Sequence, residues 1–109
     1  MLRQVQHDKK LKMNQYFVYI LRCNDGSYYT GITNDLERRF DEHQSGLNTE
    51  CYTYKRRPLK LVFHERFPDV NQAIEFEKQV KGWRRAKKEA LINRDWHLLP
   101  ELSNTANKL

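Results

Sequence analysis

The stretch that decides the fold is Tyr16 to Ile32, which reads YFVYILRCNDGSYYTGI. Apolar, aromatic and β-branched residues, which favour strands, lie on both sides of Asn24-Asp25-Gly26. A glycine in that position can adopt the positive φ that a tight hairpin turn requires. The stretch therefore predicts a β-hairpin. Its register matters for function, because the register determines whether Tyr19 and Tyr29 face the same side of the sheet.

Two registers are compatible with this turn. A two-residue Asp-Gly turn would pair Arg22 with Tyr29, which places Tyr29 on the face opposite to Tyr19. A three-residue Asn-Asp-Gly loop, with a left-handed glycine as the bulge residue, would instead pair Leu21 with Tyr29 and Tyr19 with Gly31. We favour the three-residue loop because it separates the hairpin into two consistent faces. It also leaves an open notch at Gly31, opposite Tyr19.

In this register the two faces differ in character. The more uniformly core-like face carries Val18, Ile20, Tyr28, Thr30 and Ile32. The other face carries Phe17, Tyr19, Leu21, Tyr29 and Gly31. A plainer interpretation is that both tyrosines only pack the sheet, since tyrosine is a common strand residue. Judged on the hairpin alone, the plainer interpretation is the stronger one.

Length and composition describe one small globular domain. The chain has 109 residues, of which 39% are hydrophobic and 31% charged, which argues against a disordered chain. Its longest apolar run, from Tyr16 to Leu21, is too short to span a membrane, and no signal peptide is visible. Cys23 and Cys51 make neither a disulfide framework nor a zinc set. We therefore expect a reduced, cytoplasmic protein.

The charge and the two ends of the chain suggest a partner and a domain division. A net charge of +6 favours a polyanionic partner, nucleic acid first and a membrane surface second. We expect residues 1–15 to be a flexible basic arm, residues 16–99 the domain, and residues 100–109 a flexible tail. Met13 is a second candidate for the true start of the chain.

A helix is predicted after the hairpin. Asn34 is its expected N-cap, with Glu37 in the capping-box position, and Gly46 ends it. Arg39 and His43, four residues apart, fall on the apolar stripe, where a polar group needs a partner. On spacing alone, functional roles compete evenly with plainer interpretations, in which the arginine snorkels to the surface and the histidine is partly buried without a role.

The second half of the chain continues with a connection, a strand and two helices. Residues 46–58 interleave aromatic and cationic side chains, which suits a nucleic-acid contact surface, although for any single residue a solvated loop is the favoured interpretation. A strand is expected from Leu59 to Phe67, with Leu59, Leu61 and Phe63 alternating with Lys60, Val62 and His64. His64 is expected to be structural or exposed.

Asp69 is the expected N-cap of the next helix, with Gln72 in the capping-box position. This helix is expected to bend or break at Gly82, before a further helix from Arg84 to about Asn93. Glu77 lies between the apolar stripe and the basic stripe of this helix. It could hold a hydrated divalent cation, but an ordinary surface pair with Lys81 at i,i+4 is the favoured interpretation from the residues alone.

These positions together resemble the GIY-YIG nuclease superfamily. Phe17-Val18-Tyr19 and Tyr29-Thr30-Gly31 resemble its two half-motifs, and Arg39 and His43 follow at the family's spacing. The runs at residues 52–58 and 77–83 are similar to its small stand-alone bacterial branch. Five separated elements agree in order and spacing over residues 16 to 99. The nuclease domains of the excinuclease incision subunit and of homing endonucleases belong to the same superfamily.

The resemblance implies an α+β fold, a three-stranded antiparallel sheet flanked by helices in the order β-β-α-β-α-α, which agrees with the elements predicted above. It also implies phosphodiester hydrolysis with one divalent cation, Mg²⁺ or Mn²⁺, ligated by Glu77. Tyr19 and Tyr29 would be the catalytic tyrosines, and either could deprotonate the attacking water. Since free tyrosine titrates near 10, the base needs a cationic neighbour, for which Arg39 and the metal are the candidates.

The resemblance assigns the remaining roles as well. Arg39 would stabilise charge on the phosphate, and His43 would assist proton movement or orient a tyrosine. Asn93 is the candidate for the asparagine that supports the phosphate or metal site. The expected nucleic-acid contacts are Tyr54, Lys55, Arg56, Arg57, Lys81 and Arg85. The chain departs from the nominal motif at Phe17 and Val18, which replace glycine and isoleucine, and at Thr30, which replaces isoleucine.

The functional hypothesis is a metal-dependent endonuclease acting on DNA, in repair or recombination, with RNA left open as a substrate. It is expected to be a monomer or weak homodimer with no membrane partner. One alternative is a nucleic-acid-binding module that keeps the nuclease scaffold without useful turnover. Another is an interaction partner that a second protein recruits to nucleic acid.

Overall fold

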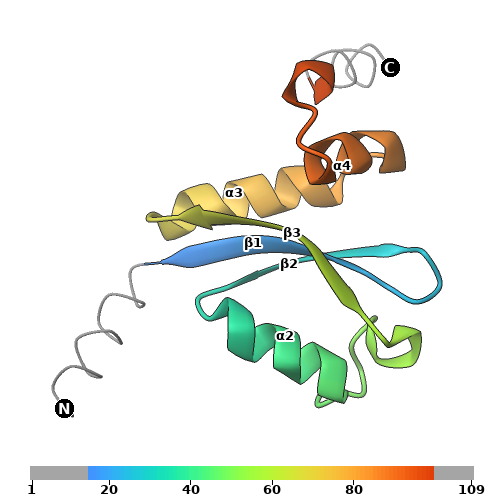
Figure 1. Cartoon of the computed structure of the whole chain (residues 1–109). Coiled ribbons are helices and arrows are strands. Elements are labelled where there is room, and N and C mark those ends of the chain that lie inside the picture. Colours follow the sequence, from blue (N-terminus) through green and yellow to red (C-terminus); the bar gives the residue numbers. More distant parts are fainter. Residues whose placement is uncertain (1–14, 100–109) are drawn as a thin grey trace, which may run out of the picture.

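The computed structural model describes residues 15–99 and shows a sheet with helices on both faces (Figure 1). The predicted basic arm, the alternative start and the predicted tail fall outside these residues, apart from residue 15. The elements in chain order are β1 (Tyr16–Arg22), β2 (Tyr28–Thr33), α2 (Leu36–Ser45), η1 (Tyr54–Arg56), β3 (Lys60–Phe67), α3 (Val70–Lys81), α4 (Arg85–Ile92) and η2 (Trp96–Leu98). Within the described range, no helix combines the length and apolarity needed to cross a bilayer.

The sheet is antiparallel in the order β2-β1-β3, so β1 is its central strand. Helix α2 covers one face, and α3 and α4 cover the other (Figure 1). Because both faces are covered, the run from Val18 to Leu21 is buried continuously rather than at alternate positions. This arrangement confirms the predicted α+β fold and the order β-β-α-β-α-α.

The hairpin has the predicted three-residue loop. Gly26 has φ +87°, and the Cys23 N–H donates to the Ser27 carbonyl at 2.8 Å. Tyr19 lies opposite Gly31, which puts it on the same face as Tyr29. The prediction of an open notch at Gly31 is wrong, however, because the ring and hydroxyl of Tyr19 occupy the space over this glycine.

Strand β3 departs from the predicted alternation. The pairing with β1 shifts between Ile20 and Leu21, so that Ile20 lies opposite Phe63 while Leu21 lies opposite Leu61. This irregularity sends Phe63 into the core beneath α3 and α4, whereas Leu59 and Leu61 pack with α2. The apolar residues of one strand thereby serve both cores, which simple alternation does not predict.

The helix ends agree with expectation in part. The N-cap of α2 is Asp35, not Asn34, since its Oδ1 accepts from the Arg38 N–H at 3.2 Å. Gly46 ends α2 at φ +74° as predicted. Asp69 precedes α3 but its side chain makes no capping hydrogen bond. Gly82 separates α3 from α4, which confirms the predicted break.

Candidate active site

The site is built on Tyr19, whose side chain is only 1% exposed at the centre of β1. The phenol reaches across the α2 face of the sheet to His43, in the last turn of α2. The Tyr19 hydroxyl and His43 Nε2 are 2.9 Å apart. The strand and the helix therefore place the two groups in direct hydrogen-bond contact, although they are 24 residues apart in the sequence.

A second hydrogen bond orients the imidazole. His43 Nδ1 lies 3.0 Å from Thr53 Oγ1, and that hydroxyl donates to Cys51 Sγ at 3.4 Å. Because the threonine proton points to the sulfur, its oxygen accepts from Nδ1–H, which leaves Nε2 to accept from the Tyr19 hydroxyl. The result is a directed chain of four side chains, from Tyr19 through His43 and Thr53 to Cys51.

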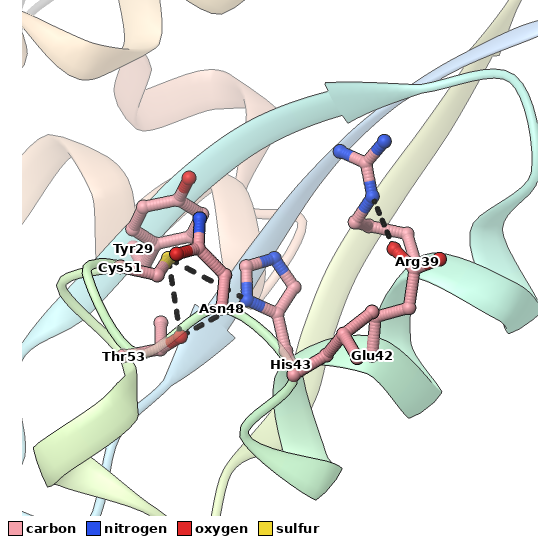
Figure 2. A pocket seen from close by; sticks show the side chains of 8 residues that line it. Tyr29, Arg39, Glu42, His43, Asn48, Cys51 and Thr53 are labelled. Carbon is pink, nitrogen blue, oxygen red and sulfur yellow. Dashed lines mark hydrogen bonds and ion pairs between the residues drawn. The ribbon is translucent and has the colours of Figure 1, made fainter.

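Tyr29 stands beside this chain at the wall of a cleft of about 350 Å³. Its ring meets the His43 ring edge-on with centroids 5.1 Å apart, and lies 6.4 Å from the Tyr19 ring. Figure 2 shows Tyr29, Cys51 and His43 turned toward one another, with the Arg39 guanidinium along the same helix as the histidine. The cleft is lined by Tyr29, Arg39, Glu42, His43, Leu47, Asn48, Cys51 and Thr53.

Arg39 contributes the positive charge of the cleft. Its Nε lies 3.2 Å from Glu42 Oε1, and its Nη1 donates to the Ile32 carbonyl at 3.5 Å. The arginine is therefore neither fully buried nor simply snorkelling to the surface. A guanidinium held by a partly exposed carboxylate can still present donors to a phosphate.

The environment sets the protonation of these groups. Burial raises the pKa of Tyr19, and the adjacent Arg39 guanidinium only partly offsets this. Burial and the nearby Tyr19 raise the pKa of Tyr29 strongly. Burial, and then Arg39, lower the pKa of His43, so the imidazole is neutral at pH 7. A neutral His43 is the form that can accept the Tyr19 proton.

The thiol of Cys51 is unusual among the cleft groups. Burial opposes its ionisation, but hydrogen bonds from Thr53 and its other neighbours outweigh burial and lower the pKa of the thiol. Cys51 Sγ also lies 3.9 Å from His43 Nδ1. The cysteine and the threonine both belong to the cleft, and the sequence analysis did not assign either of them to the site.

Glu77 lies on α3, on the other side of the sheet from α2. Its side chain is 12% exposed, and Lys81 Nζ lies 2.9 Å from its Oε2. The i,i+4 pair predicted as the plainer interpretation is therefore present. In the described part of the chain, no three His, Cys, Asp or Glu side chains are grouped so that they could hold a metal ion. A single carboxylate nonetheless fits Mg²⁺, which keeps most of its water ligands and takes others from substrate phosphates.

The predicted nucleic-acid contacts are divided between free and occupied side chains. Arg56 pairs with Asp25 at 3.0 Å and lies over the Tyr52 ring. Arg57 donates to the Tyr54 carbonyl at 2.8 Å and lies over the ring of the same residue. These contacts order the connection between α2 and β3, where Lys55 is exposed.

On the other face, Arg85 pairs with Glu89 at 2.9 Å and lies over the Tyr28 ring. Asn93 is the exposed C-cap of α4, and its N–H donates to the Glu89 carbonyl. It does not line the cleft described above. The structure therefore brings together four of the predicted catalytic residues, while the role of Asn93 stays a prediction.

Comparison with known proteins identifies the family. The model of the GIY-YIG catalytic domain matches residues 15–90. The chain belongs to the GIY-YIG family. This membership indicates a nuclease in general terms, and nucleases of this kind act on DNA, generally with a divalent metal.

Small bacterial proteins are similar to this chain over most of its length. A UPF0213 protein of Bacillus pumilus is 46% identical over 81 residues, covering 74% of this chain and 81% of the relative. UPF0213 protein BH0048 of Halalkalibacterium halodurans is 47% identical over 81 residues, which cover 74% of this chain and 84% of the relative. The solution structure of protein EF2693 from E. faecalis aligns with this chain with a TM-score of 0.55 and 35% sequence identity. The alignment covers 77% of this chain and 88% of that protein. These names state no substrate.

Proposed function

We propose that this protein is a divalent-metal-dependent endonuclease that hydrolyses phosphodiester bonds in DNA. The observation that supports this most directly is the hydrogen bond between Tyr19 and His43 beside Tyr29, in a cleft that also contains Arg39. A packed sheet does not need a buried tyrosine hydrogen-bonded to an imidazole that is itself oriented by a threonine. Phosphodiester hydrolysis does need positioned proton acceptors and a cation near the phosphate.

The residues have complementary roles in this proposal. Tyr29 lines the cleft and is the tyrosine that meets the attacking water or the phosphate. Tyr19 is buried, and its proton is held by the neutral imidazole of His43. Arg39 binds a non-bridging phosphate oxygen and offsets the charge that builds up during attack. Which tyrosine acts as the base is open to experiment, since burial raises the pKa of both.

Glu77 is the residue that would hold the metal. A bound Mg²⁺ or Mn²⁺ would supply positive charge near the phosphate and the phenols. Lys81 competes with such an ion for Glu77, because its ammonium contacts Oε2 of the carboxylate at 2.9 Å. The same ion pair is the observation that favours the alternative, a nucleic-acid-binding module on a nuclease scaffold.

A cleavage assay distinguishes the two functions. Labelled flap, branched, nicked, single-stranded and duplex DNA, with matching RNA, would be incubated with Mg²⁺, with Mn²⁺ and with EDTA. Wild type, Glu77→Ala and Tyr19→Phe would be purified in parallel. We expect metal-dependent cutting by the wild type that both variants lose while they retain binding.

Equal activity of wild type and Glu77→Ala would indicate a contaminating nuclease and would overturn the metal assignment. Salt-sensitive binding without any cutting would favour the binding module. The panel would also show which nucleic-acid structure is the substrate, and therefore whether a role in repair or recombination is tenable.

A further inference from the structure

A second hollow, the edge groove, lies on the other side of β2 from the catalytic cleft. It has a volume of about 300 Å³ and is lined by Tyr28, Tyr29, Thr30, Tyr52, Lys81 and Lys88. Strand β2 forms one edge of the sheet, so the groove opens where α3 and α4 pass that edge. Tyr29 lines both hollows, and the catalytic cleft and the edge groove therefore meet at this residue.

Thr30 gives the edge groove an unmet hydrogen-bonding group. The residue is 4% exposed, and its Oγ1 is the buried side-chain oxygen in the described part of the chain that has no hydrogen-bond partner. Leaving a buried hydroxyl unpaired costs free energy, whereas the isoleucine of the nominal motif would have no such cost. An unpaired hydroxyl in a groove wall is a group that a ligand could satisfy.

Lys88 gives the edge groove an unneutralised charge. It is half-buried on α4, and burial lowers the pKa of its ammonium group. Across residues 15–99, none of the ion pairs includes Lys88. Lys81, at the same groove, is already paired with Glu77. Lys88 and Thr30 line the same groove, and an ammonium together with an unpaired hydroxyl is a donor set that suits an anion.

The groove wall also offers a surface for a base. Tyr52 is 44% exposed, and its ring lies nearly parallel to the Tyr29 ring, at 16° with centroids 6.4 Å apart. The Arg56 guanidinium, which is paired with Asp25, lies 3.7 Å from the Tyr52 ring centroid and covers one face of that ring. Exposed aromatic rings beside a cationic groove are the usual platform for a single strand.

We propose that the edge groove binds one nucleotide of the substrate strand beside the scissile bond, with its backbone phosphate on Thr30 and Lys88 and its base against Tyr52. The proposal rests on the nuclease function above, and it specifies how the strand leaves the cleft. A strand held at the groove must pass Tyr29, which would place the neighbouring phosphate in the catalytic cleft.

The test measures binding rather than cutting, so it does not depend on catalysis. A fluorescein-labelled octathymidylate would be titrated by anisotropy in EDTA with wild type, Thr30→Val, Lys88→Met and Lys60→Met. The last variant removes an exposed lysine from β3, at the opposite edge of the sheet, and is the matched control. A series of the same oligonucleotides would carry one neutral methylphosphonate each, at successive positions.

We expect Thr30→Val to weaken binding about threefold to tenfold while its melting temperature stays equal or rises, because valine removes an unpaired buried hydroxyl. Lys88→Met should lower the slope of log affinity against log salt by about 0.7, the value for one phosphate contact on a single strand. A methylphosphonate at one position should weaken oligonucleotide binding by the wild type. The same substitution should leave binding by Lys88→Met unchanged. Lys60→Met should keep the wild-type sensitivity to that position.

Four results would overturn the proposal, the first three of them in the binding titrations. Thr30→Val could bind as tightly as the wild type, Lys88→Met could keep every methylphosphonate effect, or the wild type could fail to bind the oligonucleotide at low salt. Competition by inorganic phosphate alone, with no preference among oligonucleotides, would likewise show an anion site without a strand. The cleavage assay tests the proposed nuclease function separately, because DNA cleavage could persist in each of these cases.

Discussion

Tyr19 is held from two sides, by Gly31 beneath its ring and by His43 at its hydroxyl. A methyl group at residue 31 would overlap the phenol. We expect Gly31→Ala to lower the free energy of unfolding by about 1–3 kcal/mol through overpacking, and to displace the hydroxyl from the imidazole. Urea unfolding measures the first effect, and cleavage measures the second.

Gly82→Ala is the matched control for this substitution. A methyl group there would meet no non-neighbouring atom closer than 3.6 Å, and the residue has φ −84°, which alanine adopts readily. Alanine should stabilise the protein by about 0.4–1 kcal/mol through the unfolded chain. If Gly31→Ala were as stable and as active as Gly82→Ala, close packing of Tyr19 on residue 31 would be refuted.

Thr53 lines the wall of the cleft and positions His43 there. Its side chain is 1% exposed and 3.0 Å from Nδ1. Thr53→Val preserves shape but leaves the imidazole nitrogen unpaired, so we expect a loss of about 1–3 kcal/mol in stability and slower single-turnover cleavage. Thr53→Ser restores the hydroxyl and should recover most of both. Failure of serine to rescue cleavage would indicate that the methyl group, not the hydroxyl, matters.

At the scale of the element, α3 both packs the core and carries the candidate metal ligand. Ala73 and Val80 are buried beneath the sheet, whereas Glu77 and Lys81 lie at the border of this face and pair with each other. A helix thus holds the carboxylate at the sheet edge through apolar contacts one turn away. The ammonium group then competes with any cation for that carboxylate.

Lys81→Met should therefore tighten Mn²⁺ binding about twofold to fivefold, the range expected from losing one partly buried ion pair. Titration calorimetry with Mn²⁺ would measure the affinity without any nucleic acid. Lys78→Met removes an exposed lysine from the same helix and is the control. Glu77→Gln should abolish the binding, and Mn²⁺ affinity unchanged by Glu77→Gln would show that the ion is held elsewhere.

At the scale of the whole molecule, stability depends on the charge state of His43. Burial lowers its pKa in the folded protein, so below the ordinary value of about 6.5 the unfolded chain binds the proton more readily. The contribution of the neutral imidazole is therefore present above that value, and is lost as pH falls through the folded pKa. The free energy of unfolding should therefore decrease as the pH is lowered from 7.5 to 5.

Urea unfolding at each pH would measure this decline. We expect His43→Gln to show a smaller decline than the wild type, although it is less stable at neutral pH. His64→Gln removes an exposed histidine from β3 and controls for the loss of a titrating side chain. A wild-type pH dependence that survived in His43→Gln would have to come from the carboxylates.

Local signals in the sequence predicted the hairpin, the helix end at Gly46 and the break at Gly82, and they favoured the three-residue loop over the two-residue one. These features depend on backbone conformations that neighbouring residues impose, which is why they can be predicted without a fold. The pairing of Tyr19 with Gly31 follows from the loop length in the same way. The α+β order and the face shared by the two tyrosines were therefore predictable, and the family's residue spacing supported them.

Only the tertiary structure decided what surrounds those tyrosines. The bulge that splits β3 between two cores depends on packing against α2 and α3, and so does the filling of the notch over Gly31 by Tyr19. Thr53 and Cys51 reach His43 through an irregular connection whose path has no sequence periodicity. The physical reason is range: turns and caps are settled by adjacent residues, whereas a buried hydrogen-bond chain requires segments that meet only after the sheet has closed against its helices.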